Sequence, residues 1–366
     1  LDAYKEVQPF LEAIAAKDKT NLPCCAYIGA DGSGHFVKMV HNGIEYVEMQ
    51  LLAEVCTLLK ALGKNPDEIA TILESWKPAV NSYLLEITIA ILRKKEGKDW
   101  LVNKIMDKAG NKGTGNWTTI TTAELGVPST LIASALFARF TSFYKEDRMA
   151  ASINFGSNNI KTLSLEIQSL LNAYQFARIM NHYQGFKLIS EAAKVYQWQL
   201  NLSELARIWT NGCIIKSDLM FDLVTVLKAS DNILSNSKII ATLNSLKPDA
   251  NKIVAEAILA AGGEYHAVLP FDKTLFGKVS VSGSGTKWYE RFCRVLEQVS
   301  STTQIYVTDN FDQTTAEWVT KGPARLLPIG DISGRTDTAH LWWRPQNKQL
   351  EGTDQYNAIA NALIGP

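Results

Sequence analysis

An apolar pattern with helical periodicity runs almost without a break from Gly34 to about Ala261, and it constrains the fold more than any other feature. Segments such as Ile132 to Phe140 are apolar on more than one face, which indicates helices that pack on several sides. We therefore expect a mainly α protein whose central domain, residues 34–261, is all-helical. The predicted helices cover residues 35–62, 66–76, 80–95, 130–145, 159–181, 184–197, 202–210, 216–229 and 250–261.

Two segments of different character flank this helical region. In residues 1–33, Val7, Phe10, Leu11 and Ile14 recur at helical spacing, and the apolar run from Cys24 to Ile28 predicts a strand. This single α/β unit has no partner strands in the sequence, so we interpret it as the terminal piece of a sheet domain. Residues 262–366 alternate strand and helix patterns, which indicates a small α/β domain with a parallel sheet. Its predicted strands are 265–271, 303–308 and 338–343, and its predicted helices are 288–299 and 314–319.

Charge and cysteine content narrow the classes of function. Lys+Arg and Asp+Glu both number 37 in the 366 residues, and this balance argues against a nucleic-acid or membrane-surface binder. A small anionic substrate stays possible because a few local cations suffice for it. The five cysteines form no CxxC pair, which favours buried free thiols in a reducing cytosol. No run approaches the ~18 apolar residues of a membrane span, so we expect a cytoplasmic protein.

A stripe of mixed polar side chains lies within residues 32–50, the segment GSGHFVKMVHNGIEYVEMQ. On a helix, Lys38, His41, Asn42, Glu45 and Tyr46 share one face, because they fall at i, i+3, i+4, i+7 and i+8. For an arbitrary helix a solvated surface face is the more common explanation. The variety of donors, acceptors and titratable groups favours a functional face instead.

The glycine that follows Asn42 supports the functional interpretation. Gly43 in a helix interior costs about 1 kcal/mol relative to alanine, so we expect another part of the backbone to approach closely there.

A second segment, IMDKAGNKGTGNW at residues 105–117, is rich in glycine. Lys112 and the backbone N–H groups around Thr114 can surround an oxyanion. The signal is weak by itself because glycine-rich turns are common, and the phosphate-loop pattern GxxxxGK[ST] is not met.

These segments resemble the decarboxylating 6-phosphogluconate dehydrogenases. DKAGNKGTGNW is similar to a signature of that family, and GHFVKMVHNGIEY is similar to its catalytic helix. LGVPSTLIASALFAR at 125–139, KEDR at 145–148 and NGCIIKS at 211–217 continue the resemblance in the family's order. It extends over about residues 1–261 and implies that the all-helical domain is the family's C-terminal domain, preceded by the last unit of a coenzyme-binding domain.

The resemblance implies a reaction and a role for four residues of the polar stripe. The family oxidises 6-phosphogluconate at C3 with NADP, releases CO2 and protonates the enediol at C1 to give ribulose 5-phosphate. Lys38 matches the base at the C3 hydroxyl, for which its pKa must fall, and Glu45 matches the acid at C1, for which its pKa must rise. His41 and Asn42 match residues that hold the sugar hydroxyls.

Four further residues match the family's phosphate clamp: Tyr46, Lys112, Thr114 and Arg139. The planar guanidinium suits Arg139 to a phosphate. Judged without the resemblance, Arg139 is more simply explained as one half of a surface ion pair.

The departures from the family pattern leave two functions open. The sequence holds no GxGxxG strand–turn–helix for NADP, and no tail with the arginine and histidine that reach into the partner subunit's site. Residues 262–366 are vaguely similar to Rossmann-like nucleotide-sensing domains of bacterial signalling proteins. The chain is therefore either part of the dehydrogenase or a non-catalytic, dimeric sugar-phosphate-binding module fused to a sensing or interaction domain.

The family buries helices 130–145 and 159–181 in a dimer interface, and their apolar surface predicts a homodimer here too.

Overall fold

A computed structural model describes residues 2–110, 113–155, 165–260, 267–269, 293 and 305–307. Its contacts divide the chain into two compact units, Leu1–Gly263 and Glu264–Pro366. We call them unit 1 and unit 2. The helices of unit 1 are α1 (Asp2–Ile14), α2 (Ser33–Ala61), α3 (Pro66–Ser75), α4 (Lys77–Val80), α5 (Tyr83–Arg93), α6 (Thr114–Glu124), α7 (Thr130–Phe143), α8 (Lys145–Phe155), α9 (Ile167–Val195), α10 (Leu202–Trp209), α11 (Asp218–Ala229) and α12 (Ser237–Ala260).

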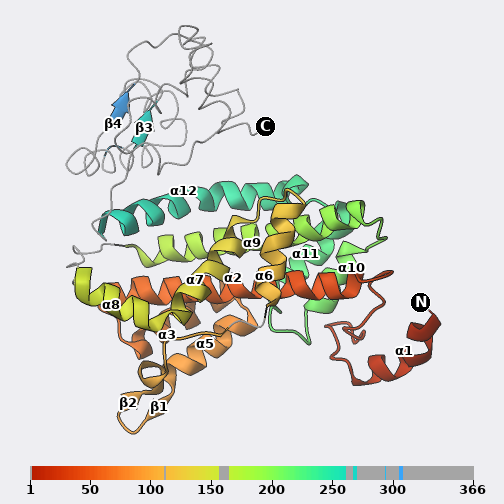
Figure 1. Cartoon of the computed structure of the whole chain (residues 1–366), viewed down its shortest axis with the longest axis horizontal. Coiled ribbons are helices and arrows are strands. Elements are labelled where there is room, and N and C mark those ends of the chain that lie inside the picture. Colours follow the sequence, from red (N-terminus) through yellow and green to blue (C-terminus); the bar gives the residue numbers. More distant parts are fainter. Residues whose placement is uncertain are drawn as a thin grey trace. The chain divides into compact units, whose positions relative to one another are not determined.

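Three long helices, α2, α9 and α12, run side by side in unit 1, and α9 lies between the other two (Figure 1). Gly185 of α9 allows the closest approach, because a Cβ atom there would overlap the side chain of Ile44 in α2. Helices α6 and α7 cover the other side of α2, and α10 packs on α11.

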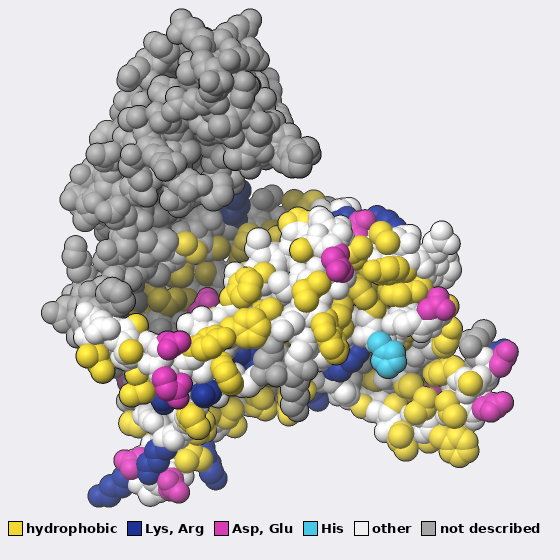
Figure 2. Space-filling model, viewed as in Figure 1, with side chains coloured by type: hydrophobic (Ala, Val, Ile, Leu, Met, Phe, Trp, Pro, Cys, Tyr) yellow, Lys and Arg dark blue, Asp and Glu magenta, His cyan; other side chains and the backbone are white. Residues whose placement is uncertain are grey.

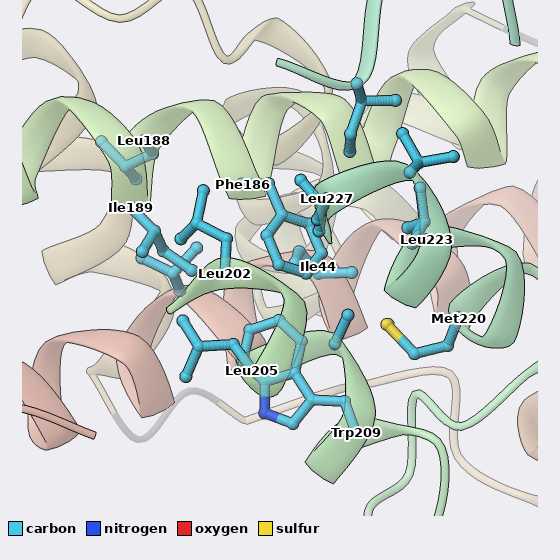
Figure 3. Close-up of a cluster of buried hydrophobic side chains, with 14 of the residues drawn as sticks. Ile44, Phe186, Leu188, Ile189, Leu202, Leu205, Trp209, Met220, Leu223 and Leu227 are labelled. Carbon is cyan, nitrogen blue, oxygen red and sulfur yellow. The ribbon is translucent and has the colours of Figure 1, made fainter. Parts of the chain in front are cut away.

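The largest buried cluster joins α2, α9, α10 and α11 (Figure 3). Phe186 and Trp209 lie at its centre with their ring centroids 5.4 Å apart, next to Ile44. A second cluster fills the space between α3, α5 and the C-terminal half of α2. The first cluster therefore buries apolar residues of the N-terminal half of α2, and the second buries those of its C-terminal half. Such burial contributes roughly 25 cal/mol per Å2 of apolar surface.

Side-chain caps define where several of these helices begin. Asn65 forms a reciprocal capping box with Glu68 at α3, and Asn201 caps α10. Ser82 and Ser217 cap α5 and α11 and also face each other in an isolated antiparallel bridge. This bridge fixes the start of α5 beside the start of α11.

Several predicted boundaries were wrong. The predicted helices 159–181 and 184–197 are one helix, α9, from Ile167 to Val195. The predicted helix 250–261 is the end of α12, which begins at Ser237 and contains Pro248. The predicted helix 80–95 ends at Arg93, where a hairpin of β1 (Lys95–Glu96) and β2 (Asp99–Trp100) turns at the left-handed Gly97. Short 3-10 turns span Leu101–Lys104 and Ile233–Ser235.

The predicted strand from Cys24 to Ile28 is also wrong. The segment has no strand structure, and among the described residues the isolated bridge next to it joins Lys17 and Pro23. A strand needs a neighbour to accept and donate its backbone hydrogen bonds, and the described part of unit 1 offers none beside these residues. Helix α1 has no buried residue, and Phe10 and Ile14 are 72% and 83% exposed.

In unit 2 the structure describes two short strands, β3 (Ala267–Leu269) and β4 (Ile305–Val307), which pair in parallel. Both fall inside predicted strands. The other predicted elements of residues 262–366 lie outside the described residues, apart from Cys293. All five cysteines are free and partly buried rather than fully buried. Across the described helices, none is both long and apolar enough to cross a membrane.

Candidate active site

The polar stripe of α2 is largely buried, which contradicts the interpretation of a solvated face. His41 is 1% exposed and Tyr46 is 9% exposed, whereas Asn42 and Glu45 are half-buried. Of the stripe, only Lys38 is exposed. Helices α6 and α7 and the end of α10 cover this side of α2, so the stripe lines a protein interior that opens at Lys38.

Hydrogen bonds connect the stripe to the start of α6. Lys38 Nζ lies 3.1 Å from His41 Nδ1, which lies 3.3 Å from Asn42 Oδ1. Asn42 Nδ2 donates to Thr114 Oγ1 at 3.2 Å. Thr114 is the first residue of α6 and follows the left-handed Gly113. This contact joins the polar stripe within residues 32–50 to the glycine-rich segment 105–117.

The environment of His41 keeps its imidazole neutral. Burial and the nearby Lys38 ammonium lower the pKa of His41 to about 4, and the contact with Asn42 opposes this only in part. Trp209 packs edge-on against the ring with 5.4 Å between centroids. A neutral Nδ1 can accept a hydrogen bond from Lys38 Nζ and so orients the lysine.

Glu45 lies one turn further along α2, between two cations. Burial raises the pKa of this carboxyl group, and the charges of Lys38 and Arg139 lower it by a smaller amount. A carboxyl group with a raised pKa holds its proton more readily near neutral pH, which suits a proton donor.

Arg139 of α7 contacts the stripe at Tyr46. Its guanidinium carbon lies 4.6 Å from the centre of the Tyr46 ring, and its Nε donates to the carbonyl oxygen of Gly110 at 2.7 Å. In the described part of the chain Arg139 pairs with no carboxylate, so the surface ion pair considered for it is not found.

Small residues allow α6 to approach α2 at this point. A Cβ atom at Gly43 would lie 2.8 Å from Thr118 Cγ2, and one at Gly115 would lie 2.7 Å from Tyr46 Cε2. The predicted close approach at Gly43 therefore exists, although the neighbour is a threonine side chain and not a backbone. The Thr118 hydroxyl also lies 3.0 Å from the carbonyl oxygen of Met39.

The residues that hold the loop before α6 were not predicted from the sequence. Arg148 bonds both the side chain and the carbonyl oxygen of Asp107, at 3.0 and 2.7 Å, and Lys145 pairs with the same carboxylate. Ser142 Oγ accepts from the N–H of Ala109 at 3.1 Å. The signal was present, because Lys145 and Arg148 form the ends of the KEDR segment.

A buried polar cluster just C-terminal to the stripe on α2 was also not predicted from the sequence. Glu48 of α2 accepts from Arg178 Nε of α9 at 2.8 Å, and both side chains are at most 3% exposed. Arg178 also donates to the carbonyl oxygen of Val80 at 3.0 Å. Asn181 donates to the carbonyl oxygen of Ile44 at 3.0 Å, and His182 Nδ1 lies 2.8 Å from the Arg178 carbonyl oxygen. We call these four residues, Glu48, Arg178, Asn181 and His182, the anchor cluster.

Comparison with known proteins identifies the family. Residues 34–266 match the family model described as 6-phosphogluconate dehydrogenase, C-terminal domain. This chain belongs to the 6-phosphogluconate dehydrogenase family. It is 44% identical over 231 residues to the decarboxylating 6-phosphogluconate dehydrogenase of Lactococcus lactis strain IL1403, covering 60% of this chain and 48% of the relative. With the Haemophilus influenzae enzyme it is 39% identical over 270 residues, covering 70% and 55%.

A solved structure gives the same result. The chain is similar to Plasmodium falciparum 6-phosphogluconate dehydrogenase with a TM-score of 0.66 and 31% identity, covering 86% of this chain and 64% of that one. That protein was solved in its apo form, with its cofactor NADP+ and with its substrate 6-phosphogluconate. The chain spans about half the length of the curated relatives that it matches.

Seven of the eight predicted site residues therefore lie around one region of this family member. These are Lys38, His41, Asn42, Glu45, Tyr46, Thr114 and Arg139. The eighth, Lys112, lies outside the described residues.

Proposed function

We propose that this chain supplies the substrate-binding and catalytic helical part of a decarboxylating 6-phosphogluconate dehydrogenase. The single observation that carries the proposal is the half-buried stripe of α2, where Lys38, His41 and Asn42 are joined by short contacts to Thr114. An amine, an imidazole and an amide in contact with one another suit proton transfer, whereas a helix face that only packs needs no titratable groups.

Lys38 and Glu45 are assigned the two proton transfers. Lys38 Nζ takes the proton from the C3 hydroxyl of 6-phosphogluconate as C3 is oxidised, and it is the exposed member of the stripe. Glu45 gives a proton to C1 of the enediol after CO2 has left. The burial that raises the pKa of Glu45 supports this assignment. His41 and Asn42 hold sugar hydroxyls and orient Lys38.

The phosphate end of the substrate is assigned to Tyr46, Lys112, Thr114 and Arg139. Arg139 offers two terminal nitrogens, since its Nε is used by Gly110. Thr114 begins an 11-residue helix, whose first N–H groups favour a negative charge.

NADP is the coenzyme of the family reaction, in which it accepts the hydride from C3. The described residues include no strand, glycine-rich turn and helix in succession, which is the arrangement that binds a dinucleotide pyrophosphate. Cys24 to Ile28 form no strand and lie beside none among the described residues. We therefore assign no NADP contact to the described residues of this chain.

We also propose that unit 1 forms a homodimer, through α6, α7 and α8. Large apolar side chains are exposed there, and hydrophobic atoms gather over these helices in Figure 2. They are Trp117, Ile120, Phe137, Phe143, Tyr144, Met149 and Ile153. We assign the described part of the predicted helix 159–181 no share in this surface, because α2 and α12 pack against α9 and Leu170, Leu171 and Tyr174 are buried. Light scattering should give a dimer that Phe137→Glu with Ile153→Glu dissociates; Ile91→Glu, on an exposed site of α5, is the control.

Calorimetry with 6-phosphogluconate tests the proposed function. The intact chain should bind it, and Arg139→Ala should weaken binding by about tenfold or more, the usual value of a charge-assisted contact. Arg93→Ala, which removes an exposed arginine paired with Glu74, serves as the control. Equal affinity for the intact chain and both variants would remove Arg139 from the site and with it the proposed phosphate clamp.

A further inference from the structure

A cavity of about 380 Å3 lies in unit 1 among residues that the proposed active site does not use. Its walls are the loop at Lys17 to Lys19, the start of α5, the segment from Thr210 to Ser217 and the first turns of α11. The volume falls within the range of pockets that hold small metabolites.

Three lysines line this cavity and form ion pairs with no carboxylate in the described part of the chain. The three are Lys17, Lys19 and Lys216. Lys216 Nζ donates to Asn211 Oδ1 at 3.1 Å, and Asn211 Nδ2 donates to the carbonyl oxygen of Lys17 at 2.9 Å, so Asn211 positions Lys216. The ammonium of Lys19 lies 3.7 Å from the centre of the Phe221 ring. These contacts hold two ammonium groups at the wall without neutralising them.

Most of the acidic groups at the cavity are already paired. Asp18 pairs with Arg207 at 2.8 Å; burial raises its pKa, but hydrogen bonds from Arg207, Thr20 and two backbone N–H groups outweigh this and lower the pKa well below its usual range. Glu86 lies 3.7 Å from Lys77. Asp218 alone has no ion-pair partner among the described residues, so the three lysines leave the cavity wall with an excess of positive charge.

The polypeptide backbone adds to this positive charge. Helices α5 and α11 have 11 and 12 residues, and the bridge between Ser82 and Ser217 places their N-termini together at the cavity. The backbone N–H groups of Tyr83 and Asp218 donate to the carbonyl oxygens of Lys216 and Asn81, at 3.0 and 3.1 Å, and so join the starts of the two helices. Two helix dipoles with their positive ends at one cavity strengthen the attraction for an anion.

We propose that this cavity is a second ligand site that binds the phosphate group of a small phosphorylated metabolite, with Lys19 and Lys216 as its cationic contacts. Lysine acts as a point charge toward phosphate, and the exposed edge of Tyr83 provides an apolar wall for the rest of such a molecule. The assignment does not depend on the function proposed for α2, because the two sets of residues do not overlap.

Titration with inorganic phosphate tests the cavity directly. All proteins carry Arg139→Ala, so that binding at the proposed active site does not mask the result, and backbone amide NMR signals report the position of the ion. The signals of Asn211 and Ser217 should shift with phosphate concentration. Lys19→Gln with Lys216→Gln should weaken this response by about tenfold or more.

The matched control is Lys228→Gln, which removes one lysine from the far end of α11. It should bind phosphate like its parent. If the double variant fails to fold, Lys19→Gln alone, in an exposed loop, should still weaken binding severalfold relative to the control. Unchanged affinity in the lysine variants, or shifts confined to residues away from the cavity, would overturn the proposal.

Discussion

Removing the carboxylate of Glu48 should destabilise unit 1 more than a typical substitution. Its partner Arg178 is 3% exposed and would keep its charge in the interior, where the carbonyl oxygen of Val80 is the one acceptor left to it among the described residues. Breaking a buried ion pair on one side costs about 3–5 kcal/mol, a large share of the total stability of a domain. Asn181 would also lose its contact with Glu48 at 3.3 Å, although it would keep its bond to Ile44.

The double variant Glu48→Met with Arg178→Met isolates the cause. Two apolar side chains of similar length leave no buried charge, so the double variant should be more stable than Glu48→Ala despite carrying one more substitution. Urea unfolding followed by far-UV circular dichroism measures this, because the long described helices all belong to unit 1. Glu191→Ala removes partly exposed ion pairs with Lys187 and Lys194 and should change the free energy of unfolding by about 1 kcal/mol at most.

Two results would refute this reasoning. A loss for Glu48→Ala no larger than that of Glu191→Ala would mean that the interior solvates Arg178 by other means. A double variant that loses the sum of the two single losses would mean that the charges are not coupled.

Three further predictions concern pH, packing and the coenzyme. The folded-state pKa of His41 is lowered to about 4, so the unfolded chain binds a proton at a higher pH than the folded chain does. The free energy of unfolding should therefore fall by up to about 3 kcal/mol as the pH is lowered from about 6.5 to 4. His41→Phe should reduce that slope in urea unfolding, and an unchanged slope would contradict it. Gly115→Ala places a Cβ atom 2.7 Å from Tyr46 and should lower the melting temperature, whereas Gly34→Ala, in open space on α2, should not; equal melting temperatures would exclude overpacking. NADP should show no micromolar affinity in a fluorescence titration, and such affinity would indicate a site in Glu264–Pro366.

Periodicity was sufficient to predict most helices because apolar spacing reports which face is buried. It failed at α9, where Asn181 and His182 interrupt the apolar pattern and suggested a break. Both side chains are buried and hydrogen-bonded, so the helix continues through them. The strand predicted from Cys24 to Ile28 failed for a different reason, since strand structure depends on a neighbour that local sequence does not contain.

The polar stripe of α2 could be recognised from the spacing of its residues, but its burial could not. Whether Lys38, His41 and Glu45 face water or protein depends on α6, α7 and Trp209, which lie far away in the sequence. Arg139 shows the same limit. Its position on a helix surface suggested an ion pair, and only the fold places it over the Tyr46 ring and against Gly110.

Helix α2 combines two requirements that conflict in most helices. Under the proposed function, one face of α2 presents Lys38 and Glu45 to a substrate, while Ile44 and Glu48 pack against Gly185 and Arg178 of α9. A helix turns by 100° per residue, so a slip of one residue would move the stripe away from Thr114 and Arg139. Apolar packing alone tolerates small repacking, whereas a rotation of α2 that separated Glu48 from Arg178 would leave two buried charges unpaired. The anchor cluster therefore fixes the rotation of α2, and its buried charges are explained by the geometry of the stripe more than by the stability that they add.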